Sequence, residues 1–214
     1  MLPSQRQLGL EIPDGGLTAP VCIANNNLVP VMEIIIVTVY PEKMGRFIVE
    51  MKSSRVKQGN KFYLAYGSNL NLEQMKHRCP YAIPLGVSDL SGYRLLFRGG
   101  NDSAVATVEP YSAGTVPVLI WEITPRDEES LDRYEGWPYL YRKETVTVTL
   151  AGKPIEAMVY IMNDGRPLGL PSEYYLDVIL EGYESAGFDN SVVDEAIRIS
   201  IYNDCQPANS LGVG

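Results

Sequence analysis

The sequence has few of the residues that build metal centres and disulfide frameworks. Its three cysteines, Cys22, Cys79 and Cys205, are widely separated and odd in number, and its one histidine is His77. This spacing matches neither a disulfide framework nor a CxxC metal site. A single imidazole is too little for a His-rich zinc site and does not readily supply a conventional Ser-His or Cys-His catalytic system. We therefore expect reduced thiols, a cytoplasmic location, and a His77 that faces solvent or a neighbour on a short helix.

Long apolar runs and an excess of positive charge are also missing. The most apolar stretch, Val29–Val39, is interrupted by Pro30 and Glu33, so it falls short of the roughly 18 consecutive apolar residues that a membrane span requires. The N-terminus has no basic region leading into an apolar segment, which argues against a secretory signal. The 26 acidic residues outnumber the 18 basic ones, and the net charge of −8 disfavours binding to nucleic acid or anionic membranes. A small neutral or zwitterionic ligand fits this composition better.

The first sixty residues differ from the rest of the chain and predict an N-terminal extension, residues 1–60. Residues 1 to about 30 are rich in Pro, Gly and Asn and indicate a loop-like arm. Two β-rich segments, 32–39 and 46–51, flank a turn at 41–45 and predict a hairpin. Four basic residues and little apolar content at 52–61 then indicate a solvated linker.

Residues 61–203 predict one α+β domain, followed by a flexible tail at 204–214. The hydrophobic content of 45% in 214 residues is enough to bury a core. Pattern and turn residues predict helices at 72–78, at 125–135, from 173 onward and at 191–201. The strands are predicted at 61–66, 83–88, 92–98, 104–109, 116–123, 141–150 and 154–162. A mainly antiparallel sheet is the simplest arrangement of these strands.

A short polar loop, Tyr66-Gly67-Ser68-Asn69, lies between the first of these strands and the helix at 72–78. The first N–H groups of a helix lack intrahelical partners and carry partial positive charge, so such a loop can bind an anion or a carboxylate. Gly67 allows close approach to the backbone, and the Ser68 and Asn69 side chains add hydrogen-bonding groups. The alternative is an ordinary strand-to-helix turn, because turns and N-caps use the same residue types.

Glu135 occupies an unfavourable position at the end of the predicted helix 125–135. The C-terminal end of a helix carries partial negative charge, which disfavours a carboxylate there. Burial against Tyr134, Trp137 and Tyr141 would also disfavour the charged form and raise the pKa of Glu135. A carboxyl group with a raised pKa can exchange protons near neutral pH. The alternative is that Glu135 is an ordinary surface glutamate, like Glu128 and Glu129.

Two segments in this order, the loop at 66–69 and Leu131-Asp132-Arg133-Tyr134-Glu135-Gly136, resemble the γ-glutamylcyclotransferase-like (AIG2-like) family. The resemblance extends to Tyr141-Arg142 and to Pro171-Ser172-Glu173-Tyr174, and it covers about residues 61–200. The family often has glycine in the strand before the catalytic helix, whereas this chain has Val116-Pro117-Val118-Leu119-Ile120-Trp121. Pocket shape is where we expect this chain to depart from the family.

The resemblance implies a partly closed, barrel-like sheet with helices packed outside. It also implies cyclisation of a γ-glutamyl amide or peptide to 5-oxoproline, with release of an amine or amino acid. Glu135 would be the general acid and base, and no metal or cofactor would be required. The N–H groups from Gly67 to Leu70 would hold the substrate carboxylate or the developing oxyanion, and Tyr66, Tyr141 and Tyr174 would complete the substrate site.

Two other functions fit the same sequence. A non-catalytic protein could bind or sequester a small molecule in the same pocket, since one fold hosts unrelated functions. Alternatively, residues 1–60 could make the chain an interaction module of a larger assembly, with the second domain as scaffold. Turnover of γ-glutamyl compounds distinguishes the enzyme from both alternatives.

Overall fold

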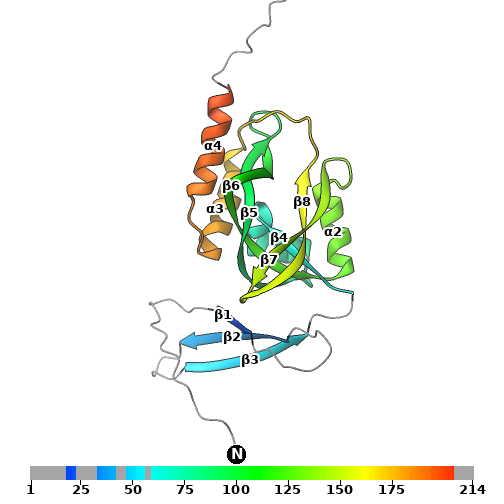
Figure 1. Ribbon diagram of the computed structural model, residues 1–214, viewed down its shortest axis with the longest axis vertical. Coiled ribbons are helices and arrows are strands. Elements are labelled where there is room, and N and C mark those ends of the chain that lie inside the picture. Colours follow the sequence, from blue (N-terminus) through cyan, green and yellow to red (C-terminus); the bar gives the residue numbers. More distant parts are fainter. Residues whose placement is uncertain (1–17, 23–32, 42–46, 56–58, 205–214) are drawn as a thin grey trace, which may run out of the picture. The chain divides into compact units, whose positions relative to one another are not determined.

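The computed structural model describes residues 18–22, 33–41, 47–55 and 59–204 (Figure 1). The chain forms two units, Met1–Arg55 and Val56–Gly214. The proposed extension at 1–60 and its boundary with the domain stay predictions. Of the tail that we expected to be flexible, 204–214, all but Asp204 lies outside the described residues.

The first unit contains a three-stranded antiparallel sheet of β1 (Thr18–Cys22), β2 (Glu33–Pro41) and β3 (Phe47–Arg55). The predicted hairpin is confirmed as β2 and β3. Two expectations are wrong: β1 lies within the stretch that we read as a loop-like arm, and β3 continues into the predicted linker. The five residues of β1 are too few to show an alternating sequence pattern. They form a strand because all five pair with residues of β2.

The second unit is built on a five-stranded sheet in the order β5-β6-β4-β8-β7. The central strand β4 (Lys61–Ala65) pairs antiparallel with β6 (Val105–Ile123) and parallel with β8 (Lys153–Met162). The outer strands β5 (Ile83–Arg98) and β7 (Tyr141–Leu150) pair antiparallel with β6 and β8. All the pairings except that of β4 with β8 are therefore antiparallel, as predicted.

The strands β5 and β6 are each continuous, whereas we predicted two shorter strands for each. The residues between the two predicted strands of β5, 89–91, instead pair with β6, and the register shifts just after them in a bulge between Ser91 and Tyr93. Gly92 adopts φ 81° there, a left-handed conformation that glycine takes without strain. A bulge keeps the ladder running while it bends and twists the strand.

The sheet curls so that β7 approaches β5 and β8 approaches β6. The backbone N–H of Thr149 in β7 donates to Ser88 Oγ in β5 at 3.3 Å, and the N–H of Met162 in β8 donates to Thr107 Oγ1 in β6 at 3.0 Å. No ladder joins β5 to β7 among the described residues, so the sheet is only partly closed. The predicted α+β fold with a partly closed, mainly antiparallel sheet is confirmed.

A 3₁₀ helix and four α-helices complete this unit. They are η1 (Ser68–Leu70), α1 (Leu72–Arg78), α2 (Pro125–Glu135), α3 (Glu173–Ala186) and α4 (Ser191–Asp204). Figure 1 shows α3 and α4 at one side of the sheet and α2 at the other. His77 lies exposed on α1, as expected. Among the helices described, none is long and apolar enough to cross a membrane.

The helix α2, which ends at the candidate site, is fixed at both ends by local signals. Thr124 and Asp127 form a reciprocal capping box, and Pro125 begins the helix. Gly136 ends the helix with φ 65°, the left-handed conformation favoured at this position. Leu131 anchors the middle of the helix in the core, where it is fully buried. These signals place Glu135 at a defined point at the end of the helix.

Candidate active site

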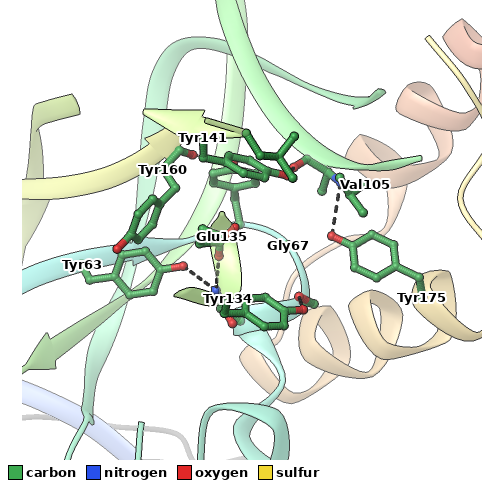
Figure 2. A pocket seen from close by; sticks show the side chains of 13 residues that line it. Tyr63, Gly67, Val105, Tyr134, Glu135, Tyr141, Tyr160 and Tyr175 are labelled. Atoms are coloured by element: carbon green, nitrogen blue, oxygen red, sulfur yellow. Dashed lines mark hydrogen bonds between the residues drawn. The ribbon is translucent and has the colours of Figure 1, made fainter. Parts of the chain in front are cut away.

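A pocket of about 210 Å³ opens where β4, η1, the end of α2 and the start of α3 meet (Figure 2). It therefore lies between the loop at 66–69 and Glu135. Its walls are strongly aromatic, with six tyrosines. The residues that line it are Tyr63, Tyr66, Gly67, Ser68, Asn69, Val105, Ala106, Tyr134, Glu135, Leu140, Tyr141, Tyr160 and Tyr175.

The carboxyl group of Glu135 is the acid of this pocket. The residue is half-buried, and burial raises the pKa of its carboxyl group from 4.5 to about 7. Two interactions oppose this rise in the pKa: the hydrogen bond from Asn69 and the positive charge of Arg78. A neutral and a charged form are therefore both populated near pH 7. The pKa of Glu135 is thus raised by burial, as expected. Of the three neighbours expected to bury it, Tyr134 and Tyr141 line the pocket and Trp137 does not.

Asn69 holds the Glu135 carboxylate through a fixed amide. Its Nδ2 donates to Glu135 Oε1 at 2.8 Å and to the Tyr63 hydroxyl at 2.8 Å, while its Oδ1 accepts from Arg78 Nη1 at 2.7 Å. Because a guanidinium group has no acceptor, the amide oxygen must face Arg78 and the NH₂ group must face Glu135. Asn69 thus orients Glu135, and its side chain is not free for a substrate.

Arg78 supports this arrangement from α1. Its Nη2 donates to Gln74 Oε1 at 2.7 Å, and its guanidinium carbon lies 3.7 Å from the centre of the Tyr134 ring. Tyr134 also makes a 3.1 Å hydrogen bond with Ser68 Oγ. A stacked and hydrogen-bonded guanidinium keeps a defined position. Arg78 therefore places one positive charge behind Asn69, close enough to lower the pKa of Glu135.

Three of the pocket tyrosines use their hydroxyl hydrogens on the protein. Tyr66 donates to the carbonyl of Tyr160, and Tyr141 donates to the carbonyl of Ala106, both at 2.6 Å. Tyr160 donates to Asp132 Oδ1, also at 2.6 Å. Burial raises the pKa of Tyr66 and Tyr141 well above the usual value for a phenol, so both stay protonated. The side chains of these three tyrosines therefore form pocket walls that hydrogen bonds hold in place.

The loop at the start of η1 approaches the opposite strand closely. A Cβ on Gly67 would lie 3.1 Å from Ala106 Cβ in β6, so glycine keeps the loop and the strand in contact. The N–H groups of Ser68 and Asn69 are the first of η1 and have no partner within it. The N–H of Leu70 donates to the carbonyl of Gly67 at 2.9 Å and is therefore not available to a ligand.

The structure brings most of the predicted site residues together. Tyr66, Gly67, Ser68, Asn69, Glu135 and Tyr141 all line the pocket. Leu70 and Tyr174 do not: Leu70 is buried beneath α3, and Tyr174 is 73% exposed. Tyr175 lines the pocket in place of Tyr174. Helix α3 begins at Glu173, and its rotation about its axis decides which of two adjacent tyrosines faces inward.

Sequence reasoning also missed Tyr63 and Tyr160, which reach the pocket from β4 and β8. Tyr63 lies three residues before Tyr66, within the predicted strand at 61–66, and the strand pattern alone does not predict that it lines a pocket. The parallel pairing of Tyr63 with Met158 brings β4 and β8 together, and no local pattern in the sequence predicts such a pairing. Among the described residues, no group of three or more His, Cys, Asp or Glu side chains could hold a metal ion.

Comparison with known proteins shows related sequences and folds. A sequence profile described as gamma-glutamyl cyclotransferase, AIG2-like, matches residues 63–177. A gamma-glutamylcyclotransferase from Bos taurus is 32% identical over 145 residues, which cover 62% of this chain and 76% of the relative.

Solved structures share the fold. One described as a gamma-glutamyl cyclotransferase has a TM-score of 0.56 at 23% identity, covering 72% of this chain and 92% of that one. YkqA from Bacillus subtilis has a TM-score of 0.55 at 15% identity, with 88% and 91% covered. Taken with the profile match and the bovine relative, these findings show that the chain belongs to the gamma-glutamyl cyclotransferase, AIG2-like family.

Proposed function

We propose that this protein converts a γ-glutamyl amide or peptide into 5-oxoproline and releases an amine or amino acid. Family membership and the bovine relative support a gamma-glutamylcyclotransferase reaction in general. The observation that carries the specific proposal is the Glu135 carboxyl group, whose pKa is raised to about 7 in a pocket of small-molecule size. A general acid and base works best when its pKa lies near the working pH.

The reaction needs proton transfers and a folded substrate. The α-amine attacks the γ-carbonyl carbon, a carbon–nitrogen bond forms, and the bond to the leaving nitrogen breaks. The α-ammonium group carries three hydrogens and the lactam nitrogen keeps one, so two protons leave it. The leaving nitrogen takes up both protons when it departs as an ammonium ion. The nucleophile belongs to the substrate, so no metal or cofactor is required for this scheme.

Glu135 transfers these protons in our proposal. Its Oε1 is held by Asn69, which leaves Oε2 to accept a proton from the α-ammonium group and return it to the leaving nitrogen. Because Asn69 donates to Oε1 in both protonation states, the carboxyl group keeps its orientation during the transfer. The Asn69 amide is thus a positioning group, and Glu135 is the catalytic residue.

The loop and the aromatic walls would hold the γ-glutamyl group. The N–H groups of Ser68 and Asn69 would donate to a substrate carboxylate or to the oxyanion that develops on the carbonyl. Tyr66 and Tyr141 stay neutral, and their rings shape the pocket. The fixed walls favour the folded conformation in which the amine reaches the carbonyl carbon.

A panel of γ-glutamyl amino acids, γ-glutamyl amines and glutathione tests the proposal, with 5-oxoproline release as the measurement. Turnover of at least one class confirms the reaction and identifies the leaving group. Binding of these compounds without any release of 5-oxoproline would contradict the proposal and favour a sequestering protein. A truncation that removes residues 1–55, the first unit, tests whether this segment contributes to substrate choice.

A further inference from the structure

Helix α2 carries three carboxyl side chains on one face, and Glu135 is the last of them. Glu128, Asp132 and Glu135 are spaced four and three residues apart, which places them along one side of the helix. Glu135 lies in the final turn, and helix ends tend to fray because their last carbonyl groups lack intrahelical partners. Asp132, one turn before Glu135, is the residue through which this helix end is bonded to the sheet.

Both the backbone and the side chain of Asp132 hold the end of α2. Its carbonyl oxygen accepts from the N–H of Gly136 and, at 2.9 Å, from the N–H of Trp137. Its carboxylate binds Lys143 Nζ in β7 at 2.7 Å and accepts from the Tyr160 hydroxyl in β8 at 2.6 Å. Two strands therefore contact the residue that closes the helix.

Lys143 connects the last two turns of α2. Its Nζ also binds Glu128 Oε1 at 2.7 Å, and it lies 4.6 Å from the centre of the Trp137 ring. Lys143 thus contacts the chain both before and after Glu135. The side chains of Lys143, Glu128 and Asp132 are only 20%, 15% and 21% exposed, so their ion pairs are less hydrated than pairs on an open surface. Burial lowers the pKa of Lys143, but the hydrogen bonds to Asp132 and Glu128 outweigh burial and raise that pKa, so Lys143 stays charged.

The Asp132 carboxylate also supports the amide that orients Glu135. The Tyr160 ring, whose hydroxyl binds Asp132, lies edge-on to the Tyr63 ring with the ring centres 5.8 Å apart (Figure 2). The Tyr63 hydroxyl accepts from Asn69 Nδ2, and the same Nδ2 donates to Glu135 Oε1. Asp132 is therefore connected to Glu135 along the helix and, through two rings, to its hydrogen-bond partner Asn69.

Building on the proposed function, in which Glu135 transfers protons, we propose that Lys143 is a positioning residue. Its bond to Asp132 fixes the end of α2 and so holds the Glu135 carboxyl group at the substrate. Loss of this bond lets the helix end shift, and a displacement of about 1 Å at a catalytic group can cost on the order of 100-fold in rate. The loop at 66–69 binds the substrate in our proposal, so KM should change less than kcat.

The test compares Lys143→Met with Lys61→Met, a matched control. Lys61 in β4 also binds Glu128, at 2.8 Å, but its side chain is 55% exposed and its ion pair does not include Asp132. At a temperature where both variants are folded, we expect Lys143→Met to lower kcat by about ten- to hundredfold and Lys61→Met to keep the wild-type kcat. Lys143→Arg keeps the charge and has donors for both carboxylates, so it should retain most of kcat. An unchanged kcat in Lys143→Met, or an equal loss in Lys61→Met or in Lys143→Arg, would overturn the proposal.

Two further measurements separate positioning from an electrostatic or a general structural effect. The pKa of Glu135 depends on burial, on Asn69 and on Arg78, so Lys143→Met should leave the pH profile of kcat/KM in place, and a shifted profile would overturn the positioning role. In a double-mutant cycle, Asp132→Asn and Lys143→Met remove the same ion pair, so the double variant should lose about as much kcat as either single variant. Losses that multiply would also overturn the proposal, because the two residues would then act independently.

A spectroscopic experiment needs no turnover and separates failure of this inference from failure of the proposed function. The side-chain NH₂ group of Asn69 reports on the position of Glu135, because it donates to both Glu135 and Tyr63. Its NMR signals, identified by their loss in Asn69→Ala, should be shifted or broadened in Lys143→Met and should match wild type in Lys61→Met. Unchanged signals in Lys143→Met would overturn the inference. If the wild-type protein releases no 5-oxoproline, the proposed function fails, whereas a response of these signals to Lys143→Met still supports the positioning of Glu135 by Lys143.

Discussion

Replacing Glu135 with glutamine should stabilise the protein above neutral pH and have little effect in acid. The amide keeps the shape of the side chain, and its oxygen can still accept the hydrogen bond from Asn69. Folding raises the pKa of Glu135 from 4.5 to about 7, so the folded protein binds this proton more tightly than the unfolded chain. This tighter proton binding adds to the free energy of unfolding of the wild-type protein. The added stability is fully present below about pH 4.5 and is lost as the pH rises through about 7.

The size of the effect follows from the same pKa. The pKa of Glu135 rises from 4.5 to about 7. Each pKa unit corresponds to about 1.4 kcal/mol, so the upper limit of the stability lost on ionisation is about 3.5 kcal/mol. Because Glu135 is only half-buried, solvent screening lowers this value, and we expect about 1 to 3 kcal/mol. For a chain of this size, that gain corresponds to a rise in Tm of roughly 2 to 10 °C.

Denaturant unfolding at about pH 5 and about pH 8 measures the effect. We expect Glu135→Gln to be more stable than wild type at the higher pH, with most of the gain absent at the lower pH. The matched control is Glu129→Gln, which removes an exposed glutamate from the same helix and should behave alike at both values. A gain of equal size at the two pH values, or the same response in both variants, would refute the raised pKa of Glu135.

Three other substitutions test the supports of the site. Arg78→Met removes the positive charge that lowers the pKa of Glu135, so the pH profile of kcat/KM should move to higher pH; an unmoved profile would contradict this role. Gly182→Ala places a Cβ 2.6 Å from Leu70 Cβ and should lower the free energy of unfolding by about 1 to 3 kcal/mol in urea. Thr124→Ala removes the cap of α2 and should cost about 1 kcal/mol in the same assay, whereas Thr124→Ser should cost less.

Local signals in the sequence predicted the helices well. The capping box at Thr124 and the glycine at 136 act within a few residues, so the ends of α2 could be read from the chain alone. The strands were harder because pairing is not local. The sequence indicates a break at 89–91, yet these residues pair with β6, and β5 continues past a bulge between Ser91 and Tyr93.

The candidate site was predictable in part. Glu135 lies at the helix end that disfavours a carboxylate, which marked it as unusual, and the resemblance to the family implied its role. The role of Asn69 was not predictable, because its amide is fixed by Arg78, nine residues further along the chain. Tyr175 lies within the helix predicted from residue 173 onward, and no local signal separates it from its neighbour Tyr174. Only the packing of α3 against η1 shows that its hydroxyl reaches the pocket.

The most direct test of the central claim is the rate of 5-oxoproline release by wild-type protein, Glu135→Gln and Glu129→Gln, measured in parallel on the best γ-glutamyl substrate. We expect Glu129→Gln to match wild type. Glu135→Gln should remain folded and lose on the order of 100- to 10,000-fold in rate, as expected for removal of a general acid and base. A folded Glu135→Gln variant that releases 5-oxoproline at the wild-type rate would contradict the assignment of Glu135 as the catalytic residue.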